Sequence, residues 1–463
     1  MDDAAAAGLT VGDEVEVRVG PVAHGGQCVA RHGAAGQVIF VRHCLPGEQV
    51  RALVTEVGPQ GRYARADAVQ VLEASPDRVE APCPFSGPGR CGGCDWQHVR
   101  LPTQRRLKAD VVAEQLVRLG GFSEAQVADL GLVCEAVPGD QEGLRWRTRV
   151  EFAVGGQGTV VGLRAHRSHR VVPLDDCLIA TEGVLATGAL EQRAPAAASA
   201  LDAVDPSVGG PVLVPLTPGE ERGRGQGRGR GGHGGGRGGR DDRRRGRSRT
   251  APRPMTTVPE VTERVVTEAG GTHDYTLSAR GFWQVHPGAA TAFTEQVLDW
   301  LAPGPGERAL DLYSGVGLFA VPLAEAVSPS GSVLAVEADR EATRAARRHL
   351  AAYPWAEALD RPTEPALQEL VAAGERADVI VLDPPRTGAG RAVVEAVAAL
   401  RPRTVVYVAC DPAALARDLA TAREVGLELA ELRVLDAFPM THHVECLARL
   451  VPRGVDEQDP DRP

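Results

Sequence analysis

A cysteine stands at the end of an apolar run in the C-terminal part of the chain, Val405-Val-Tyr-Val-Ala-Cys-Asp-Pro412. The run has the length and composition of a buried strand, which places Cys410 just beyond the end of that strand. α/β sheets carry their active sites outside the carboxyl ends of their strands. Most other cysteines of this kind are buried and structural. The position therefore predicts Cys410 as a catalytic nucleophile.

A glycine-rich turn follows another apolar run, in Asp311-Leu-Tyr-Ser-Gly-Val-Gly317. Its glycines let the backbone turn sharply and approach a ligand, with a helix N-terminus beyond. The next apolar run ends on Glu337, where a carboxylate can accept hydrogen bonds from both hydroxyls of a ribose. Residue 320 is alanine, so the third glycine of the dinucleotide fingerprint is missing. The pattern predicts a nucleotide-like cofactor and leaves open a nicotinamide dinucleotide or S-adenosylmethionine.

A third run ends in Asp383-Pro-Pro-Arg386, which adds a carboxylate and a rigid loop at the same predicted sheet edge. A thiol beside an electrophilic methyl donor indicates covalent methyl transfer to a carbon atom. C5 of uracil fits this chemistry, because it is a poor nucleophile until a thiolate adds at C6. The C5 proton must then leave, which requires a general base nearby.

Candidate bases lie in Phe438-Pro-Met-Thr-His-His-Val-Glu445. His442, His443 and Glu445 are each able to accept a proton, and partial burial would raise the pKa of the carboxyl toward the useful range. The chemistry alone leaves the choice between the histidines and Glu445 open.

A group of cysteines further upstream has metal-ligand spacing. It comprises Cys83, Cys91 and Cys94, the last two in a Cys-Gly-Gly-Cys step. Such a group is a strong metal signal and needs a fourth ligand. Cys177 is the best candidate and Cys134 is its rival. Four thiolates suit zinc and an iron–sulfur cluster equally, so spacing does not identify the metal.

Short apolar runs alternate with helices rich in alanine, leucine and arginine over residues 261–455. The predicted strands are residues 308–313, 332–337, 378–383 and 404–409. This alternation predicts an α/β domain with a Rossmann-like, doubly wound parallel sheet. Two later runs, 427–435 and 445–451, are expected to pair as its antiparallel edge.

The N-terminal region reads as two smaller β-rich domains. Short valine-rich runs separated by glycine turns over residues 9–73 predict a small β-barrel in residues 1–75. Such a barrel is either a structural cap or an oligonucleotide-binding module. Residues 76–185 are predicted to form a central domain that carries the cysteines, with a helix over 103–120 and strands over 144–174.

Low-complexity sequence separates the central and C-terminal domains, in residues 186–260. We expect this insertion to be disordered, because little apolar surface offsets the ordering entropy. Residues 219–250 contain eleven arginines and four acidic residues, a net charge of +7, although the whole chain carries −10. The arm is either a tolerated surface insertion or an RNA contact.

The whole-chain features narrow the class of protein. A length of 463 residues predicts two or three domains. No apolar stretch reaches about 18 residues, which argues against a membrane span. The N-terminus lacks the basic-then-apolar pattern of a signal peptide, so a cytoplasmic location is expected. In that compartment the nine cysteines are expected to be ligands, nucleophiles or buried thiols rather than disulfides.

Together these motifs resemble the S-adenosylmethionine-dependent RNA uracil-5-methyltransferase family from about residue 9 to residue 451, apart from the insertion. The N-terminal barrel resembles a TRAM domain, which is an RNA-binding module. The resemblance implies a covalent methyl transfer to C5 of a uridine in tRNA or rRNA. It implies Cys410 as nucleophile and Glu445 as base.

The same resemblance implies the ligand sets. The implied contacts to S-adenosylmethionine are Gln284 (in Phe282-Trp-Gln-Val285), Tyr313, Glu337 and Asp383. The cysteine motif is similar to one that binds a [4Fe-4S] cluster, which implies Cys83, Cys91, Cys94 and Cys177 as its ligands. Two departures stand out: the family's usual asparagine is absent near Arg347–His349, and residues 356–370 match the adenine-contacting segment only weakly.

Three other functions remain open at this stage. A radical methylthiotransferase also combines a cluster with a TRAM barrel, but would leave Cys410 without a role. An RNA cytosine-5 methyltransferase usually carries a second cysteine at the strand end where this chain has Asp383. A non-catalytic RNA-binding protein built on an inactive methyltransferase would bind RNA equally well without Cys410.

Overall fold

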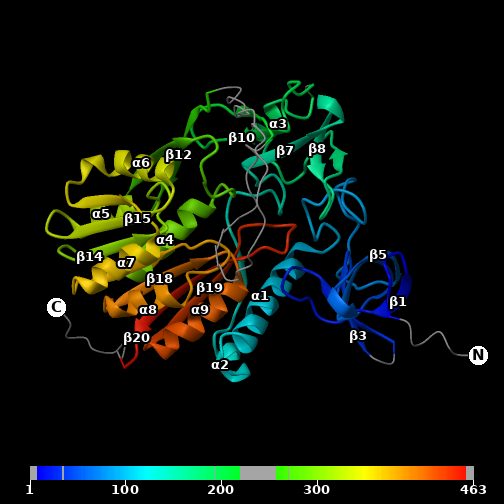
Figure 1. Cartoon of the computed structure of the whole chain (residues 1–463), viewed down its shortest axis with the longest axis horizontal. Coiled ribbons are helices and arrows are strands. Elements are labelled where there is room, and N and C mark those ends of the chain that lie inside the picture. The colour runs from blue at the N-terminus through cyan, green and yellow to red at the C-terminus, as the bar shows by residue number, and fades with distance from the viewer. Residues whose placement is uncertain (1–7, 34–35, 192, 219–256, 269–270, 455–463) are drawn as a thin grey trace, which may run out of the picture.

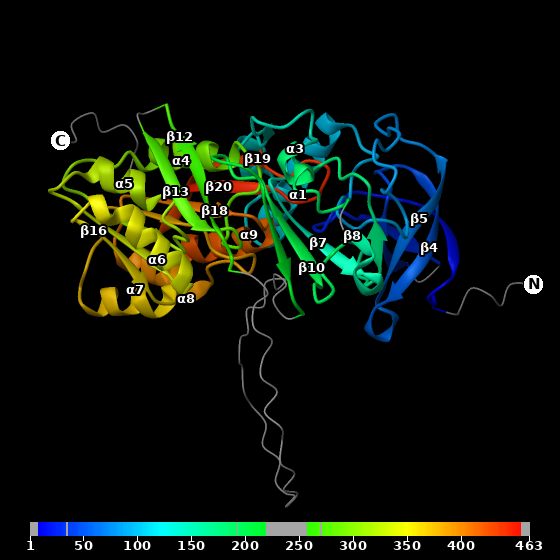
Figure 2. The same ribbon diagram turned by 90° about the horizontal axis from the view of Figure 1, so that it is seen from above.

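The computed structural model describes residues 8–33, 36–191, 193–218, 257–268 and 271–454 (Figure 1). The N-terminal barrel and the C-terminal α/β domain lie at opposite ends of the molecule. The central domain joins them, as the view from above shows (Figure 2). In the described part of the chain, no helix is both long and apolar enough to cross a membrane.

The N-terminal barrel is built from five strands. They are β1 (Glu14–Arg18), β2 (Cys28–His32), β3 (Gln37–Arg42), β4 (Gln49–Val57) and β5 (Tyr63–Glu73). The sheet order is β1-β4-β5-β3-β2. In β1, Val15 and Val17 point into the core while the charged residues between them face solvent, which is the alternation expected of a half-buried strand.

The central domain contains a second five-stranded sheet, in the order β11-β10-β7-β8-β9. Its elements are α1 (Leu101–Arg118), α2 (Glu124–Asp129), β7 (Arg149–Gly155), β8 (Val160–Arg164), β9 (Val171–Pro173), α3 (Glu182–Ala186), β10 (Ala200–Val204) and β11 (Val212–Leu216). The predicted helix and strands of this region are therefore present, and α1 starts two residues earlier than predicted.

The prediction that residues 186–260 are disordered throughout is wrong for its first part. All five residues of β10 are buried, and β10 pairs with both β7 and β11. Short strands of alanine, valine and leucine gain their stability from the neighbouring strands rather than from local sequence, which is why composition alone hid them. Residues 219–250, the arginine-rich arm, lie outside the described residues.

The C-terminal domain holds a two-stranded hairpin and an eight-stranded mixed sheet. The hairpin consists of β12 (Glu260–Val266) and β13 (Thr272–Ser278). In spatial order, the sheet is β16 (Ala356–Asp360), β15 (Ser332–Glu337), β14 (Arg308–Leu312), β17 (Val379–Leu382), β18 (Thr404–Ala409), β20 (Glu445–Pro452), β19 (Leu427–Asp436) and β6 (Cys134–Ala136). The strands from β16 to β18 are parallel, as predicted for a doubly wound fold.

Helices cover both faces of this sheet. One face packs against α4 (Ala289–Leu301), α5 (Ala320–Val327) and α6 (Arg340–His349). The other packs against α7 (Thr363–Ala372), α8 (Arg391–Ala399) and α9 (Pro412–Glu424), together with α1 and α2. Successive residues of β18 alternate between the two cores, which explains why this strand is one continuous apolar run in the sequence.

Two details of the sheet differ from the sequence analysis. β19 and β20 pair antiparallel as predicted, but they are not the edge, because β6 from the central region adds on parallel to β19. β6 has only three residues and β16 only five, and neither run is apolar enough to be recognised alone.

Helix α1 connects the barrel to the sheet. Leu107 and Val111 belong to the core of the barrel, whereas Val112 and Leu116 belong to the core of the sheet. A buried ion pair fixes the helix in place, since Lys108 Nζ donates to Asp436 Oδ1 at 2.5 Å and both side chains are fully buried.

We expect Lys108→Met to lower the free energy of unfolding by about 3 kcal/mol, because Asp436 would be left charged and buried beside only a partly exposed arginine. Chemical denaturation followed by tryptophan fluorescence measures this. Arg118→Ala is the matched control, because it removes an exposed ion pair with Glu114 on the same helix, and should cost less than about 1 kcal/mol. Equal losses in the two variants would show that the buried pair does not anchor α1.

Candidate active site

Register within the parallel sheet brings three of the predicted cofactor residues side by side. Leu312 at the end of β14 pairs with Val336 of β15 and with Leu382 of β17. The residues that follow this row are Tyr313, Glu337 and Asp383. The carboxyl ends of β14, β15 and β17 therefore present these side chains along one edge, on both sides of the point where the strand order reverses.

The predicted nucleophile and base meet at the same edge because β20 runs antiparallel to β18. Ala409 of β18 pairs with Cys446 of β20. One step outward along this antiparallel pair stand Cys410 and Glu445. The end of one strand and the start of the other thus place a thiol and a carboxyl opposite each other, although 34 residues separate them in the chain.

The carboxyl groups at this edge repel one another. Burial, together with the charges of Asp383 and Glu337, raises the pKa of Asp311 to about 8. Burial and Glu337 raise the pKa of Asp383 to about 7. Burial and Asp383 raise the pKa of Glu445 well above its usual value. A cationic ligand at this edge would relieve that repulsion.

Cys410 experiences the same field. Burial raises the pKa of its thiol to about 12, and the negative charges of Glu445 and Asp383 contribute. The exposed guanidinium of Arg386, in the loop after β17, acts in the opposite direction and lowers the pKa of both Cys410 and Glu445. The surroundings therefore favour the protonated form of both the thiol and the carboxyl.

The glycine-rich turn after β14 has the geometry of a ligand cradle. Tyr313 has a positive φ of 61°, and Gly315 and Gly317 follow with φ of 54° and 90°. The backbone N–H of Gly315 donates to Glu337 Oε2 at 2.9 Å, which ties the turn to the next strand. A Cβ added to Gly315 would meet no atom within 4 Å, so open space adjoins the turn.

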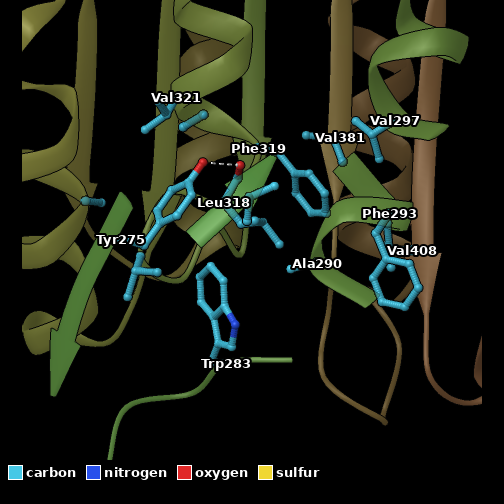
Figure 3. Packing of buried hydrophobic residues seen from close by; sticks show 14 of the residues in the cluster. Tyr275, Trp283, Ala290, Phe293, Val297, Leu318, Phe319, Val321, Val381 and Val408 are labelled. Atoms are coloured by element: carbon cyan, nitrogen blue, oxygen red, sulfur yellow. Dashed lines mark hydrogen bonds between the residues drawn. The ribbon is translucent and has the colours of Figure 1, made fainter. Parts of the chain in front are cut away.

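Two side chains that sequence analysis missed hold this turn from behind. Tyr275 of β13 donates from its hydroxyl to Leu318 O at 3.0 Å, and its ring lies over Trp283 with 5.3 Å between ring centroids (Figure 3). His349 Nδ1 lies 2.8 Å from Val316 O, and its Nε2 accepts from the N–H of Thr276 at 2.9 Å. His349 thus lies where the sequence lacked the family's asparagine, and its hydrogen bonds join the turn to the hairpin.

Gln284 lies buried on the segment between β13 and α4, with 8% of its surface exposed. Thr148 fixes this segment to the central domain, because its N–H and its hydroxyl both donate to Val285 O, at 2.9 and 3.0 Å. Phe282 beside it is 71% exposed. No interaction that joins Gln284 to the carboxyl-lined edge is seen among the described residues.

A cavity of about 200 Å³ opens beside Cys410. Its walls come from three domains: His24 and Gly26 from the barrel, Trp96 from the central domain, and Cys410 and His443 from the C-terminal domain. Arg386, after β17, and His442, in the loop before β20, also line it. Burial, His442 and Arg386 lower the pKa of His443 to about 2, so this ring is neutral. In this cavity a nucleobase would contact the thiol of Cys410.

The cysteine segment also reaches this cavity. Asp95 follows Cys94, and its Oδ2 lies 2.6 Å from His442 Nδ1. Burial opposes ionisation of Asp95, but the hydrogen bond and charge of His442 lower its pKa overall. Gln104 of α1 holds the loop before β20 as well, accepting from the N–H of Met440 at 2.8 Å and donating to Trp96 O at 3.1 Å.

The four predicted cluster ligands gather in the central domain. Cys91, Cys94 and Cys177 share one apolar cluster, and the charges of Cys83 and Cys177 raise the pKa of Cys94 further after burial. The rival Cys134 lies elsewhere, on β6 in the core of the C-terminal sheet. The described residues nevertheless contain no group of three or more histidine, cysteine or acidic side chains placed to hold a metal ion.

Comparisons with known proteins agree with this architecture. Residues 260–452 match the family model described as tRNA (Uracil-5-)-methyltransferase, and residues 8–69 match the TRAM domain. An uncharacterized RNA methyltransferase of Streptomyces coelicolor is 46% identical over 446 residues, covering 96% of this chain and 93% of the relative. The 23S rRNA (uracil(1939)-C(5))-methyltransferase of Shewanella sp. (strain MR-4) is 32% identical, covering 92% of this chain and 93% of the relative.

A solved structure shows the same fold. The tRNA (uracil-54, C5)-methyltransferase of Pyrococcus abyssi, in complex with S-adenosyl-L-homocysteine, superposes with a TM-score of 0.62 at 21% identity, covering 94% of this chain and 100% of that chain. Fold and family match define an S-adenosylmethionine-dependent methyltransferase with an N-terminal TRAM domain. The chain belongs to the RNA uracil-5-methyltransferase family.

Membership of this family decides against two of the alternatives, the radical methylthiotransferase and the RNA cytosine-5 methyltransferase. The edge also suits S-adenosylmethionine on physical grounds. Its carboxyl groups lack a compensating cation in the cofactor half of the site, and the buried hydroxyl of Ser314 has no hydrogen-bond partner among the described residues. A sulfonium and an ammonium group, with ribose hydroxyls, would meet these requirements.

We expect S-adenosylmethionine to bind more tightly as the pH rises, because a cation prefers the ionised carboxyls. Asp383 has its pKa raised to about 7, so below that pH binding must release a proton and the affinity should fall by up to about tenfold per pH unit. Titration calorimetry between about pH 6 and about pH 9, in buffers of different ionisation enthalpy, measures both quantities.

Asp383→Asn should bind more weakly at every pH and lose most of this pH dependence. Asp378→Asn is the matched control, because this carboxylate lies at the opposite end of β17 and should leave the affinity unchanged. An affinity of the wild-type protein that is independent of pH would contradict the account of the carboxyl edge.

Proposed function

We propose that this protein transfers a methyl group from S-adenosylmethionine to C5 of a uridine in RNA, through a covalent bond between Cys410 and C6. The observation that carries this proposal is the pairing of Ala409 with Cys446, which sets Glu445 opposite Cys410, a residue that lines the cavity. The covalent route requires a nucleophile and a base within reach of one ring, and these two residues are that pair.

The steps follow from the chemistry of uracil. Cys410 and Glu445 first release their protons to solvent. Cys410 then adds as thiolate to C6, which makes C5 nucleophilic. Bound S-adenosylmethionine would supply an electrophilic methyl group for C5 to attack, with the S–CH3 electron pair staying on sulfur as S-adenosylhomocysteine leaves. Glu445 then removes the C5 proton, and the electron pair of the C5–H bond forms the C5–C6 double bond as the Cys410 sulfur leaves. The thiolate regained in this way completes the cycle.

The electrostatics of the site support this order of events. Burial raises the pKa of both Cys410 and Glu445 and so favours their protonated forms. Arg386 favours the ionised form of both groups. A cation held by Asp383 and Glu337 would act in the same direction, so binding of the methyl donor would prepare the thiol and the base together.

The target uridine must leave its stack before Cys410 can reach C6, because the ring faces are covered in stacked RNA. We propose that the flipped base enters the cavity between Cys410 and His443. The neutral ring of His443 and the backbone of Gly26 would then flank it. Phe282 is exposed near the cofactor segment and is suited to stack on a neighbouring base.

The RNA class is tRNA or rRNA. Curated relatives at 30% identity or more support RNA as the substrate, and the Shewanella relative acts on uracil 1939 of 23S rRNA. The TRAM domain would supply phosphate contacts, with exposed arginines such as Arg31 and Arg62. The arginine-rich arm of residues 219–250 is proposed as a further RNA contact.

Cys410→Ala should abolish 5-methyluridine formation while changing the affinity for S-adenosylmethionine by less than about twofold, because the thiol lies across the edge from the cofactor turn. The assay combines nucleoside mass spectrometry on unmodified 23S rRNA and tRNA transcripts with calorimetry. Cys446→Ala, one residue from Glu445 but on the opposite face of β20, is the control and should retain methylation. Methylation by Cys410→Ala would exclude the covalent route; lack of methylation by the wild-type protein would favour a non-catalytic RNA binder.

We further propose that Cys83, Cys91, Cys94 and Cys177 hold a [4Fe-4S] cluster. The donor chemistry fits, since the four thiols lie near enough to raise one another's pKa. Arg145 holds the backbone of the fourth, because it donates to Cys177 O at 3.0 Å and pairs with Asp176. Among the described residues no group of side chains is placed to hold a metal ion, so no catalytic step is assigned to the cluster.

Protein purified without oxygen should contain about four iron atoms per chain. Cys94→Ser should lower both the iron content and the thermal unfolding temperature, because a cluster bound only to the folded state stabilises it. Cys134→Ser removes the rival thiol and should leave the iron content unchanged. Zinc in place of iron, or equal loss of iron in both variants, would contradict this assignment.

A further inference from the structure

The barrel contributes directly to the cavity beside Cys410 through its turn at residues 23–27. Ala23 closes the turn by donating from its N–H to Gln27 O at 2.8 Å, and Gly26 N–H donates to Ala23 O at 3.0 Å. Gly25 and Gly26 both have positive φ, 97° and 79°. The turn is therefore a defined structure that only small residues can make.

This turn touches three of the segments that surround the cavity. Gly26 O accepts from Trp96 Nε1 at 3.1 Å, next to the cysteines. A Cβ added to Gly26 would lie 2.4 Å from Cβ of His442, so the turn is packed against the loop before β20. His24 Nε2 lies 3.1 Å from Asp411 Oδ2, the residue that follows Cys410.

Asp411 uses its two oxygens for different purposes. Oδ1 accepts from the N–H of Ala414 at 2.8 Å and caps α9, while Oδ2 faces His24. Because Cys410 is the residue before this cap, the position of its thiol depends on where Asp411 is held. The His24 contact links a residue of the RNA-binding barrel to the nucleophile across 387 positions of sequence.

The contact with Asp411 favours the charged form of His24. The hydrogen bond and the charge of Asp411 raise the pKa of His24, and Glu114 on α1 adds to this, whereas burial and Arg417 on α9 oppose it. His442, His443, Arg386 and Cys410 face the same cavity. The ion pair between His24 and Asp411 is therefore present at low pH and is lost as the pH rises through the raised pKa of His24.

We propose that His24 is a positioning residue of the methyl transfer: through Asp411 it holds the Cys410 segment where the thiol attacks the uridine, so that the barrel completes the active site as well as binding RNA. The inference rests on the proposed function. It predicts an effect on the chemical step rather than on RNA affinity, since the partly exposed side chain of His24 contacts Asp411 and lines the cavity.

The test compares wild-type protein with His24→Ala and His24→Gln, using whichever of the 23S rRNA and tRNA transcripts the wild-type enzyme methylates. His24→Ala should lower the single-turnover rate at saturating RNA about three- to fivefold near pH 6, as expected for loss of one partly exposed ion pair. The dissociation constant for RNA should change by less than about twofold. The ratio of the wild-type rate to the His24→Ala rate should approach one near pH 9, because the wild-type bridge is lost there.

His24→Gln separates positioning from folding, because glutamine can donate to Asp411 without a charge. It should restore part of the rate, with a ratio to His24→Ala that does not change with pH. His32→Ala, on β2 of the same barrel, is the matched control and should behave as wild type. Both readouts use the full chain.

Equal rates for wild type and His24→Ala at every pH would overturn the inference. So would a weaker RNA affinity with an unchanged single-turnover rate, which would make His24 an RNA contact. A wild-type protein that forms no 5-methyluridine would overturn the proposed function and this inference with it. If the wild-type protein is active and His24→Ala has the same rate, the inference is overturned and the proposed function stands.

Discussion

The buried ion pair between Lys108 and Asp436 is the constraint on which the rest of the structure depends. Two buried charges that hold each other cannot shift independently, because separating them would leave each uncompensated in an apolar core. Lys108 lies on α1, whose two apolar faces belong to the barrel and to the sheet. It also donates to Phe438 O at 3.0 Å, at the start of the loop that leads to Glu445. One contact thus fixes the relative positions of barrel, sheet and base.

The carboxyl groups at the edge of the sheet lower the stability of the folded protein. The buried carboxyls of Asp311 and Glu445 crowd together with the half-buried Asp383 at the ends of β14, β20 and β17, and each has its pKa raised by the others or by burial. A protein that only had to fold would gain by replacing them. The arrangement makes physical sense for a site whose resident ligand is a cation, which would convert repulsion into binding energy and ionise the groups that the reaction needs.

Much of the fold and of the candidate site could be predicted from the sequence, for a physical reason. Strands buried on both faces are continuous apolar runs, and in a parallel sheet the residues after such runs meet at one edge. The placement of Cys410, Glu337 and Asp383 at that edge was therefore predicted from position alone. β10 was not predicted because its stability comes from pairing with β7. The contacts of His24 with Asp411 and of Asp95 with His442 join segments hundreds of residues apart, and no local pattern marks them.

The account turns on one claim, that Cys410 bonds to the uridine and Glu445 removes the C5 proton. Intact-mass spectrometry of Glu445→Gln, incubated with S-adenosylmethionine and the transcript that the wild-type protein methylates, tests it directly. The account predicts a protein–RNA adduct that survives denaturant, carries the transferred methyl group and disappears when Cys410→Ala is added. Steady formation of 5-methyluridine by Glu445→Gln with no adduct would contradict it.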